Sequence, residues 1–132
     1  MCEMKTNENL FKGCSAYEER IVRAMVPKLV ERLECDNPVI TYSDLARQLG
    51  CGHRHLSMPL LRMKEVFDRI SPRPPYLNAL CVLKSTRLPG KGLANVEPDY
   101  RLRGERVVME EMNRLAKAYK NWDEVLNLIS QI

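Results

Sequence analysis

The sequence contains no uncharged apolar run that approaches the roughly 18 residues needed to span a membrane. Its beginning, MCEMKTNENLFKGCS, mixes acidic with basic side chains and lacks the apolar core of a secretory signal. The five cysteines are scattered and include no C-x-x-C pair, so neither a disulfide framework nor a zinc ribbon is indicated. Reduced thiols fit an intracellular protein, and we therefore expect a cytoplasmic protein that does not contact membranes.

Side chains that carry catalysis or metal binding are also scarce. The nearest approach to a metal pattern is Cys51-x-His53-x-His55, which has no fourth ligand elsewhere. Glu65 and Asp68 are the only carboxylates in the middle of the chain, and their spacing is that of surface ion pairs on a helix. No nuclease-type cluster of metal ligands can be assembled from these residues. The sequence therefore predicts no enzymatic activity, no metal and no other cofactor.

Acidic residues are rare in one third of the chain. Residues 1–46 contain six Lys or Arg against eight Asp or Glu, and residues 92–132 contain six against seven. Residues 47–91 contain nine against two, a net charge of +7 in a chain whose total is +4. An ordinary solvated surface gives such a pattern. A surface that binds a polyanion also gives it, because each neutralised phosphate releases counterions.

Apolar periodicity predicts a mainly helical chain with one domain. Residues 17–34 repeat apolar side chains at three- and four-residue steps, and Pro27 is expected to kink this helix or to restart it after Val26. Two more helices are expected at the C-terminus, over 105–120 and from Trp122 onward. We expect an N-terminal tail over residues 1–15 and a single winged-helix-like domain over 16–132 with a C-terminal helical extension.

The stretch ITYSDLARQLGCGHRHL, residues 40–56, carries the start and stop signals of a helix-turn-helix. Thr41 can cap a short helix over 42–49 with Asp44 at its third position, and Gly50 suits a left-handed stop. A second helix should come at once after this stop, which is the layout of a helix-turn-helix.

This second helix is predicted over residues 55–70. His53, Arg54 and His55 then lie at its N-terminus, where free N–H groups and the helix dipole favour anions. The cluster of cationic or ionisable side chains adds to that preference. The helix start is therefore predicted to contact an anion.

A basic hairpin is predicted after the second helix. Residues 76–84 read as a mostly buried strand, and a partner strand is expected within 93–102. The turn-rich STRLPGKG between them would present Lys84, Arg87 and Lys91 at the tip of a wing. The predicted fold class is thus mainly α with a small β-hairpin: a winged helix-turn-helix with extra N- and C-terminal helices.

The stretch ITYSDLARQLGCGHRHLSMPL opens a segment, Ile40 to Leu93, that resembles the DNA-binding part of O6-alkylguanine-DNA alkyltransferases and alkyltransferase-like proteins. In that family a T-Y-x-x-L-A helix ends in Gly and leads into a helix that begins around an arginine. The resemblance implies that Tyr42 lies against a DNA phosphate and that Arg54 fills the gap left by a flipped nucleotide. It also implies entry through the minor groove and extrusion of a base. Without the resemblance, Tyr42 reads as an ordinary first-turn helix residue.

The reactive motif of the alkyltransferases, Pro-Cys-His-Arg, is missing. Asn78-Ala79-Leu80 stand where its first three residues would be, and Cys81 lies two residues late. No neighbouring histidine lowers the pKa of the Cys81 thiol, as a reactive cysteine requires. Cys81 is therefore predicted to be a small buried residue, and alkyltransferase-like thiol chemistry is the lesser alternative.

These observations predict a non-catalytic module that binds double-stranded DNA, with the N-terminus of helix 55–70 in a groove and the 84–91 wing on phosphates. The predicted DNA-binding residues are Tyr42, His53, Arg54, His55, Ser57, Lys84, Arg87 and Lys91. The alternative is a protein-interaction function, as in an immunity, anti-defence or adaptor protein whose basic face meets an acidic partner. The oligomeric state is not predicted.

Overall fold

The computed structural model describes residues 5–6, 9–52 and 55–130, which form a mainly helical fold, as predicted. Its α-helices are α1 (Ala16–Arg32), α2 (Tyr42–Leu49), α3 (Ser57–Asp68), α4 (Tyr100–Arg103), α5 (Glu105–Ala118) and α6 (Trp122–Ser130). Two 3-10 helices, η2 (Asn78–Leu80) and η3 (Gly90–Asn95), join them. Four two-residue strands pair as two small sheets: β1 (Lys5–Thr6) antiparallel with β3 (Ile70–Ser71), and β2 (Ile40–Thr41) parallel with β4 (Cys81–Val82).

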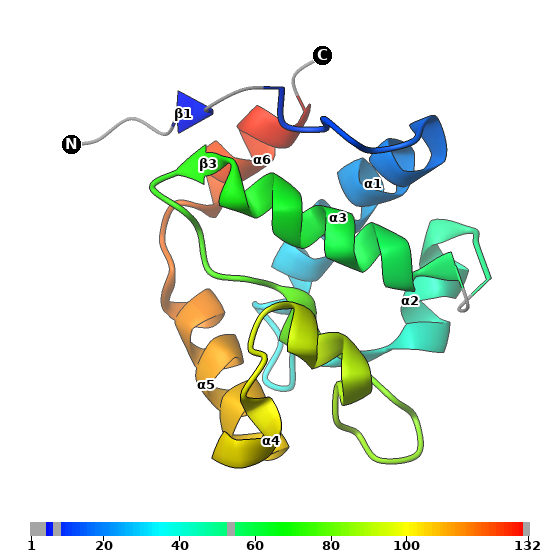
Figure 1. Cartoon of the computed structure of the whole chain (residues 1–132), viewed down its shortest axis with the longest axis vertical. Helices are drawn as coiled ribbons and strands as arrows, with labels where there is room; N and C mark the ends of the chain where they lie inside the picture. Colours follow the sequence, from blue (N-terminus) through cyan, green and yellow to red (C-terminus); the bar gives the residue numbers. More distant parts are fainter. Residues whose placement is uncertain (1–4, 7–8, 53–54, 131–132) are drawn as a thin grey trace.

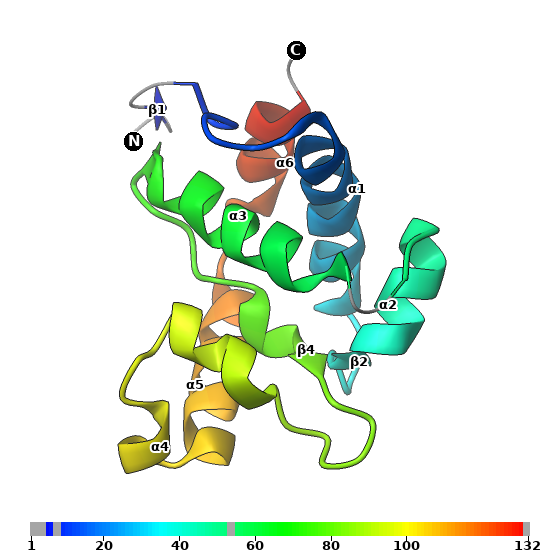
Figure 2. The ribbon, with the colours of Figure 1, turned by 45° about the vertical axis from the view of Figure 1, so that its right-hand side comes forward.

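The helices bury two apolar clusters. The larger lies where α1 packs against α3 and α6, and the smaller lies between η2, η3 and the α4–α5 pair (Figures 1 and 2). The segment from Ala79 to Val82 runs between the two clusters. Leu80 and Cys81 belong to the larger cluster, whereas Ala79 and Val82 belong to the smaller one. This segment is buried on both sides, in agreement with its predicted burial.

Helix α1 starts with a capping box at Ser15. The Ser15 hydroxyl accepts a hydrogen bond from the Glu18 N–H (3.1 Å), and the Glu18 carboxylate accepts one from the Ser15 N–H (2.9 Å). The helix runs through Pro27 without a break, so the expectation of a restart there is wrong. Pro27 lies on the exposed side, and buried residues on either side, such as Met25 and Leu29, hold the helix to the core despite the missing N–H.

The segment before α1, which the sequence predicted to be a tail, is packed on the domain. β1 pairs with β3, and Leu10 and Phe11 belong to the larger apolar cluster. The cluster of buried side chains thus begins several residues before the predicted domain boundary at residue 16.

The predicted β-hairpin does not form. Strand β4 pairs in parallel with β2, with Ile40 opposite Cys81, and the expected partner segment 93–102 contains η3 and α4 instead. That segment lacks the alternating pattern of a half-buried strand. Leu93 reaches the smaller cluster from η3, and Tyr100 reaches it from α4.

A tight loop takes the place of the hairpin tip. The Leu83 N–H donates to the Leu88 carbonyl (2.9 Å), and the Arg87 N–H donates to the Leu83 carbonyl (2.8 Å). Arg87 has a left-handed backbone conformation at φ 59°. The predicted wing is therefore a closed loop of residues 83–88 that leads into η3.

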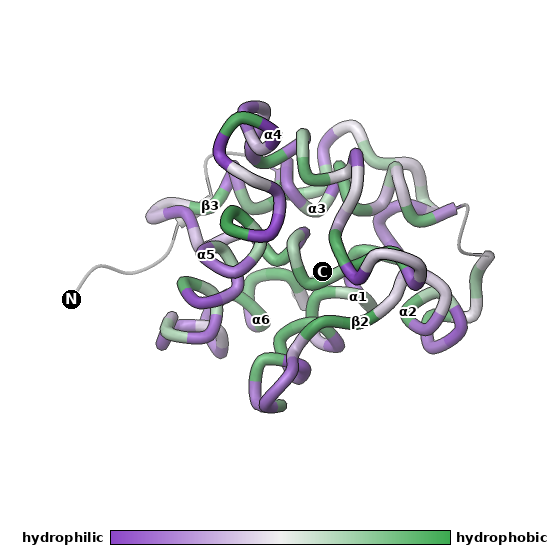
Figure 3. The backbone as a smooth tube through the Cα atoms, turned by 90° about the horizontal axis from the view of Figure 1, so that it is seen from below, coloured by the Kyte–Doolittle hydropathy of each residue, from purple (hydrophilic) through white to green (hydrophobic). Residues whose placement is uncertain are grey.

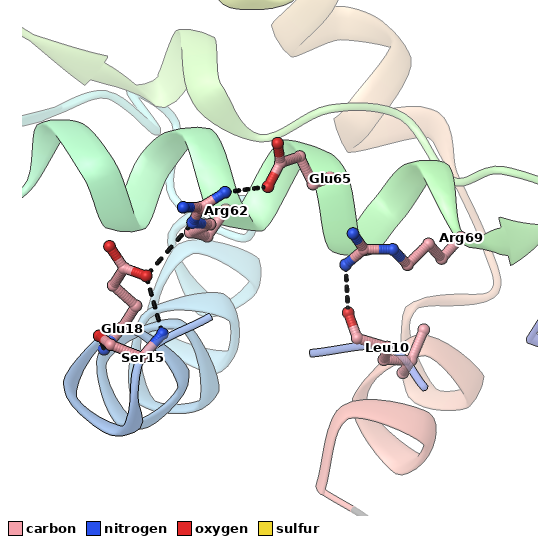
Figure 4. Close-up of polar contacts among 6 residues, drawn as sticks. All are labelled: Leu10, Ser15, Glu18, Arg62, Glu65 and Arg69. Atoms are coloured by element: carbon pink, nitrogen blue, oxygen red, sulfur yellow. Dashed lines mark hydrogen bonds and ion pairs between the residues drawn. The ribbon is translucent and has the colours of Figure 1, made fainter. Parts of the chain in front are cut away.

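Two arginines of the basic third, residues 47–91, hold α3 to the N-terminal part of the chain (Figure 4). Arg62 Nε donates to Glu18 Oε1 (3.2 Å), and Arg62 Nη1 donates to Glu65 Oε1 (2.8 Å). Arg69 Nη1 donates to the Leu10 carbonyl (2.8 Å). These arginines stabilise the packing of α3 on α1 and on the preceding segment, so they are not available to a ligand.

Replacing Glu18 with glutamine is expected to make the stability less sensitive to acid. Hydrogen bonds from the Ser15 N–H and from Arg62 hold the pKa of Glu18 below its ordinary value. A carboxylate of this kind stabilises the fold above its unfolded-state pKa and loses that contribution as the pH falls through the folded-state pKa. Urea unfolding from about pH 6 to about pH 3 should show a smaller loss of stability in Glu18→Gln than in the wild type. Equal losses would contradict the expectation.

Candidate nucleic-acid interface

A hollow of about 310 Å³ lies where the starts of α2 and α3 meet the loop that leads into η3. We call it the Tyr42 hollow; its walls are formed by Tyr42, Leu56, Ser57, Leu60, Asn78, Leu83, Pro89, Lys91, Gly92 and Asn95. The first residues of α2 and α3 and the loop that leads into η3 therefore line one hollow. Three predicted DNA-binding residues, Tyr42, Ser57 and Lys91, are thus brought to one place.

The N-terminus of α3 at this hollow is not capped by a side chain. Leu56 occupies the N-cap position, and the first turn contains no acidic residue. Its backbone N–H groups therefore keep the partial positive charge that attracts anions. The helix starts at Ser57, two residues later than the predicted 55. A start at His55 would require an N–H on Pro59 to bond the His55 carbonyl, and proline has none.

Tyr42 lies in the wall of the hollow and binds the loop. Its hydroxyl donates a hydrogen bond to the Pro89 carbonyl (2.7 Å), and burial raises its pKa. A side chain at Gly92 would place its Cβ 3.3 Å from the same hydroxyl. Because a phenol has one proton to donate, Tyr42 in this state cannot also donate to the phosphate contact that the resemblance implies.

Replacing Tyr42 with phenylalanine is expected to lower the free energy of unfolding by about 1 kcal/mol, because the Pro89 carbonyl loses its donor. Urea denaturation measures this loss. Leu102→Ala is the control, since Leu102 is 89% exposed, and its effect should stay within about 0.5 kcal/mol. Equal stabilities of Tyr42→Phe and the wild type would show that the hydroxyl does not hold the loop.

Asn78 is a buried amide in the wall of the hollow. It is 5% exposed, and its Nδ2 donates to the Leu60 carbonyl (3.0 Å). Its Oδ1 has no partner among the described residues and is itself fully buried, so it lies behind the surface of the hollow. Sequence reasoning did not identify Asn78 as a site residue, although a single amide within the apolar run YLNALCVL was a signal.

The three predicted wing cations do not line one hollow. Lys91 lines the Tyr42 hollow, Arg87 lines a separate hollow beside α5, and Lys84 is exposed. None of them forms a hydrogen bond or ion pair through its side chain within the described ranges. They are therefore free to bind phosphates. This contrasts with Arg62 and Arg69, which belong to the same basic third and are held in the fold.

Of the remaining predicted contacts, His53 and Arg54 fall outside the described residues. His55 is exposed, and its N–H donates to the Gly52 carbonyl (2.9 Å). His55 lies two residues before Ser57, the first residue of α3, and is not part of the lining of the Tyr42 hollow.

No thiol lines the Tyr42 hollow. Cys81 is fully buried, as predicted, and burial raises its pKa to about 12. Ala79, which stands where the alkyltransferases have their reactive cysteine, is buried in the smaller cluster. In the described part of the chain, no three His, Cys, Asp or Glu side chains come together as a metal site would require. No described helix is long and apolar enough to cross a membrane.

Comparisons with known proteins leave these observations without a family assignment. No family model matches the chain, and neither the curated proteins nor the solved structures contain a match. The resemblance to alkyltransferase-like proteins rests on the residues from Ile40 to Leu93.

Proposed function

We propose that this protein binds double-stranded DNA and does not alter it chemically. In this proposal α2 and α3 act as a winged helix-turn-helix, and the 83–88 loop with the start of η3 replaces the hairpin wing. One observation carries the proposal: the uncapped N-terminus of α3 and the unpaired Lys91 border the same hollow. An uncapped helix start next to a free cation is suited to a phosphate group.

The contacts divide into phosphate binding and base binding. The backbone N–H of Ser57 and the ammonium groups of Lys84 and Lys91 would bind phosphates and orient the duplex. The Tyr42 hollow, at about 310 Å³, is at the small end of ligand pockets, which span roughly 300–1,000 Å³. A base extruded from the duplex, as the resemblance implies, would enter it and lie between its apolar side chains, such as Leu56 and Leu60.

The absence of chemistry in this proposal rests on the environment of the cysteines near the site. A nucleophilic cysteine needs a thiolate and access to the substrate. Cys81 has neither, because it is buried and its pKa is raised to about 12. We therefore expect that incubation with an alkylated duplex leaves the mass of the protein unchanged.

Fluorescence anisotropy with a labelled duplex tests the proposal. Titrations with intact, mismatched and alkylated duplexes, single-stranded DNA and RNA should show salt-dependent binding with a preference for a distorted or damaged duplex. Arg54→Ala should weaken that binding, whereas Arg20→Ala, on the exposed side of α1, should not. Binding that is independent of salt, or unchanged by Arg54→Ala, would refute DNA recognition.

The alternative of a protein partner has its own expected result. A protein that binds an acidic protein through the same basic surface would be indifferent to every nucleic acid in the series and would co-purify with a stoichiometric partner. That outcome would replace the DNA-binding proposal.

A further inference from the structure

Another hollow lies beside α5 and shares no lining residue with the Tyr42 hollow. We call it the Asn113 hollow. It measures about 450 Å³ and lies between α5, residues 36–39 after α1, and Arg87 of the 83–88 loop. Hydrophilic and hydrophobic residues are interspersed along α5 (Figure 3). Met109 and Asn113 of this helix are buried, whereas its charged lining residues Arg106, Glu110 and Arg114 are exposed. The hollow is thus built by three segments distant in sequence.

Cations outnumber acids in this hollow. Arg87, Arg106 and Arg114 line it, and none of the three guanidinium groups has a hydrogen bond or ion pair to another described residue. Two carboxylates, Asp36 and Glu110, also lie at its rim. Unpaired guanidinium groups bind phosphate through two parallel N–H bonds, a geometry that neither a lysine nor a carboxylate can supply.

Apolar side chains form part of the same hollow. Val39 and Met109 line it, together with Asn113. Asn113 is 8% exposed, and its Nδ2 donates to the Ala79 carbonyl (3.1 Å). Its Oδ1 has no donor among the described residues, but this oxygen is itself fully buried and lies behind the lining of the hollow. A ligand that fits this hollow therefore needs an apolar part as well as a negative charge.

We propose that the Asn113 hollow binds a nucleoside monophosphate. The phosphate would pair with the arginines, and the base would lie on the apolar wall of Val39 and Met109. A DNA backbone or inorganic phosphate would pair with the arginines but would not contact the apolar wall. The proposal does not rest on the proposed DNA-binding function, because the two hollows have different lining residues, although Arg87 belongs both to the Asn113 hollow and to the 83–88 loop.

Amide chemical shifts of the full chain, measured during titration with each of the common nucleoside 5′-monophosphates, test the proposal. At least one nucleotide should saturate, with shifts in α5 and in residues 36–39. Adenosine, which lacks the phosphate, and inorganic phosphate, which lacks the nucleoside, are titrated for comparison. Each should bind about tenfold or more weakly than the nucleotide, because each makes only part of the contacts. Inorganic phosphate that binds as tightly as the nucleotide would overturn the assignment of a nucleoside.

Two sets of variants locate the site. Arg106→Gln/Arg114→Gln should weaken nucleotide binding about tenfold or more, since both residues are exposed and their replacement leaves the core intact. Arg20→Gln/Arg101→Gln removes the same charge elsewhere and should leave nucleotide binding unchanged. Lys91→Gln should also leave it unchanged, although duplex binding should weaken. The proposal would be refuted if no nucleotide bound the wild type. It would also be refuted if Lys91→Gln lost nucleotide binding while Arg106→Gln/Arg114→Gln kept it.

Discussion

Replacing Lys84 and Lys91 together with glutamine is expected to weaken duplex binding roughly 60-fold at about 0.1 M salt. Both side chains lack partners within the described ranges, so the change removes cations without breaking a contact of the fold. Each phosphate contact adds about −0.9 to the slope of log K against log salt concentration, and the loss of two contacts should flatten that slope by about 1.8. Anisotropy titrations over a range of salt concentrations measure both quantities.

The control for this prediction removes the same charge at a different place. Arg20→Gln/Lys120→Gln lowers the net charge by two, and both residues are exposed outside the Tyr42 hollow. Its salt slope should equal that of the wild type. If both double variants lose affinity equally, binding depends on net charge alone, and the placement of DNA at the Tyr42 hollow is wrong.

Replacing Phe67 with alanine is expected to lower the free energy of unfolding by about 3–5 kcal/mol. Phe67 on α3 is fully buried, and its ring packs against the Trp122 ring of α6 with their centroids 6.1 Å apart. The change leaves a cavity where α1, α3 and α6 meet. Because small domains have stabilities of about 5–15 kcal/mol, the variant should be partly unfolded under mild conditions.

Urea denaturation followed by circular dichroism measures this effect. Leu102→Ala is the matched control, because Leu102 is 89% exposed on α4, and its effect should lie within about 0.5 kcal/mol. A Phe67→Ala loss below about 1.5 kcal/mol would mean that the α3–α6 contact is not part of a close-packed core.

The helices whose limits depend on neighbouring residues were predicted most accurately from the sequence. Helix α2 covers residues 42–49, as predicted, because its limits depend on neighbours: the Thr41 hydroxyl accepts from the Asp44 N–H (3.1 Å), and Gly50 has φ 73°. A cap requires only residues within one turn, and all of them are adjacent in the sequence. The apolar periodicity of α5 likewise depends on spacing alone.

The hairpin was predicted wrongly because strand pairing is not local. The apolar stretch around Cys81 has the composition of a strand, but its partner Ile40 lies 41 positions earlier, in the segment that ends at the N-cap of α2. Nothing in a run of alternating residues specifies which other segment it pairs with, or in which direction. The same gap in local information concealed Asn113, whose partner is the Ala79 carbonyl 34 residues away.

The candidate site was predicted in part. Tyr42, Ser57 and Lys91 were named from the sequence and meet at one hollow. Arg87, named with them, lines the other hollow, and Asn78 was not named at all. Residue type indicated which side chains can bind an anion, whereas the direction in which each one points depends on the path of the 83–88 loop.

By itself, the sequence determined the helical character of the chain, the limits of α2 and the position of the basic segment. These properties depend on residue type and short-range spacing. Only the tertiary structure decided which cations are free. Arg62 is paired with Glu18, 44 positions away, whereas Lys84 and Lys91 have no partner in the described part of the chain. A charge belongs to a residue, but its neutralisation depends on contacts between distant segments, and those contacts exist only once the chain has folded.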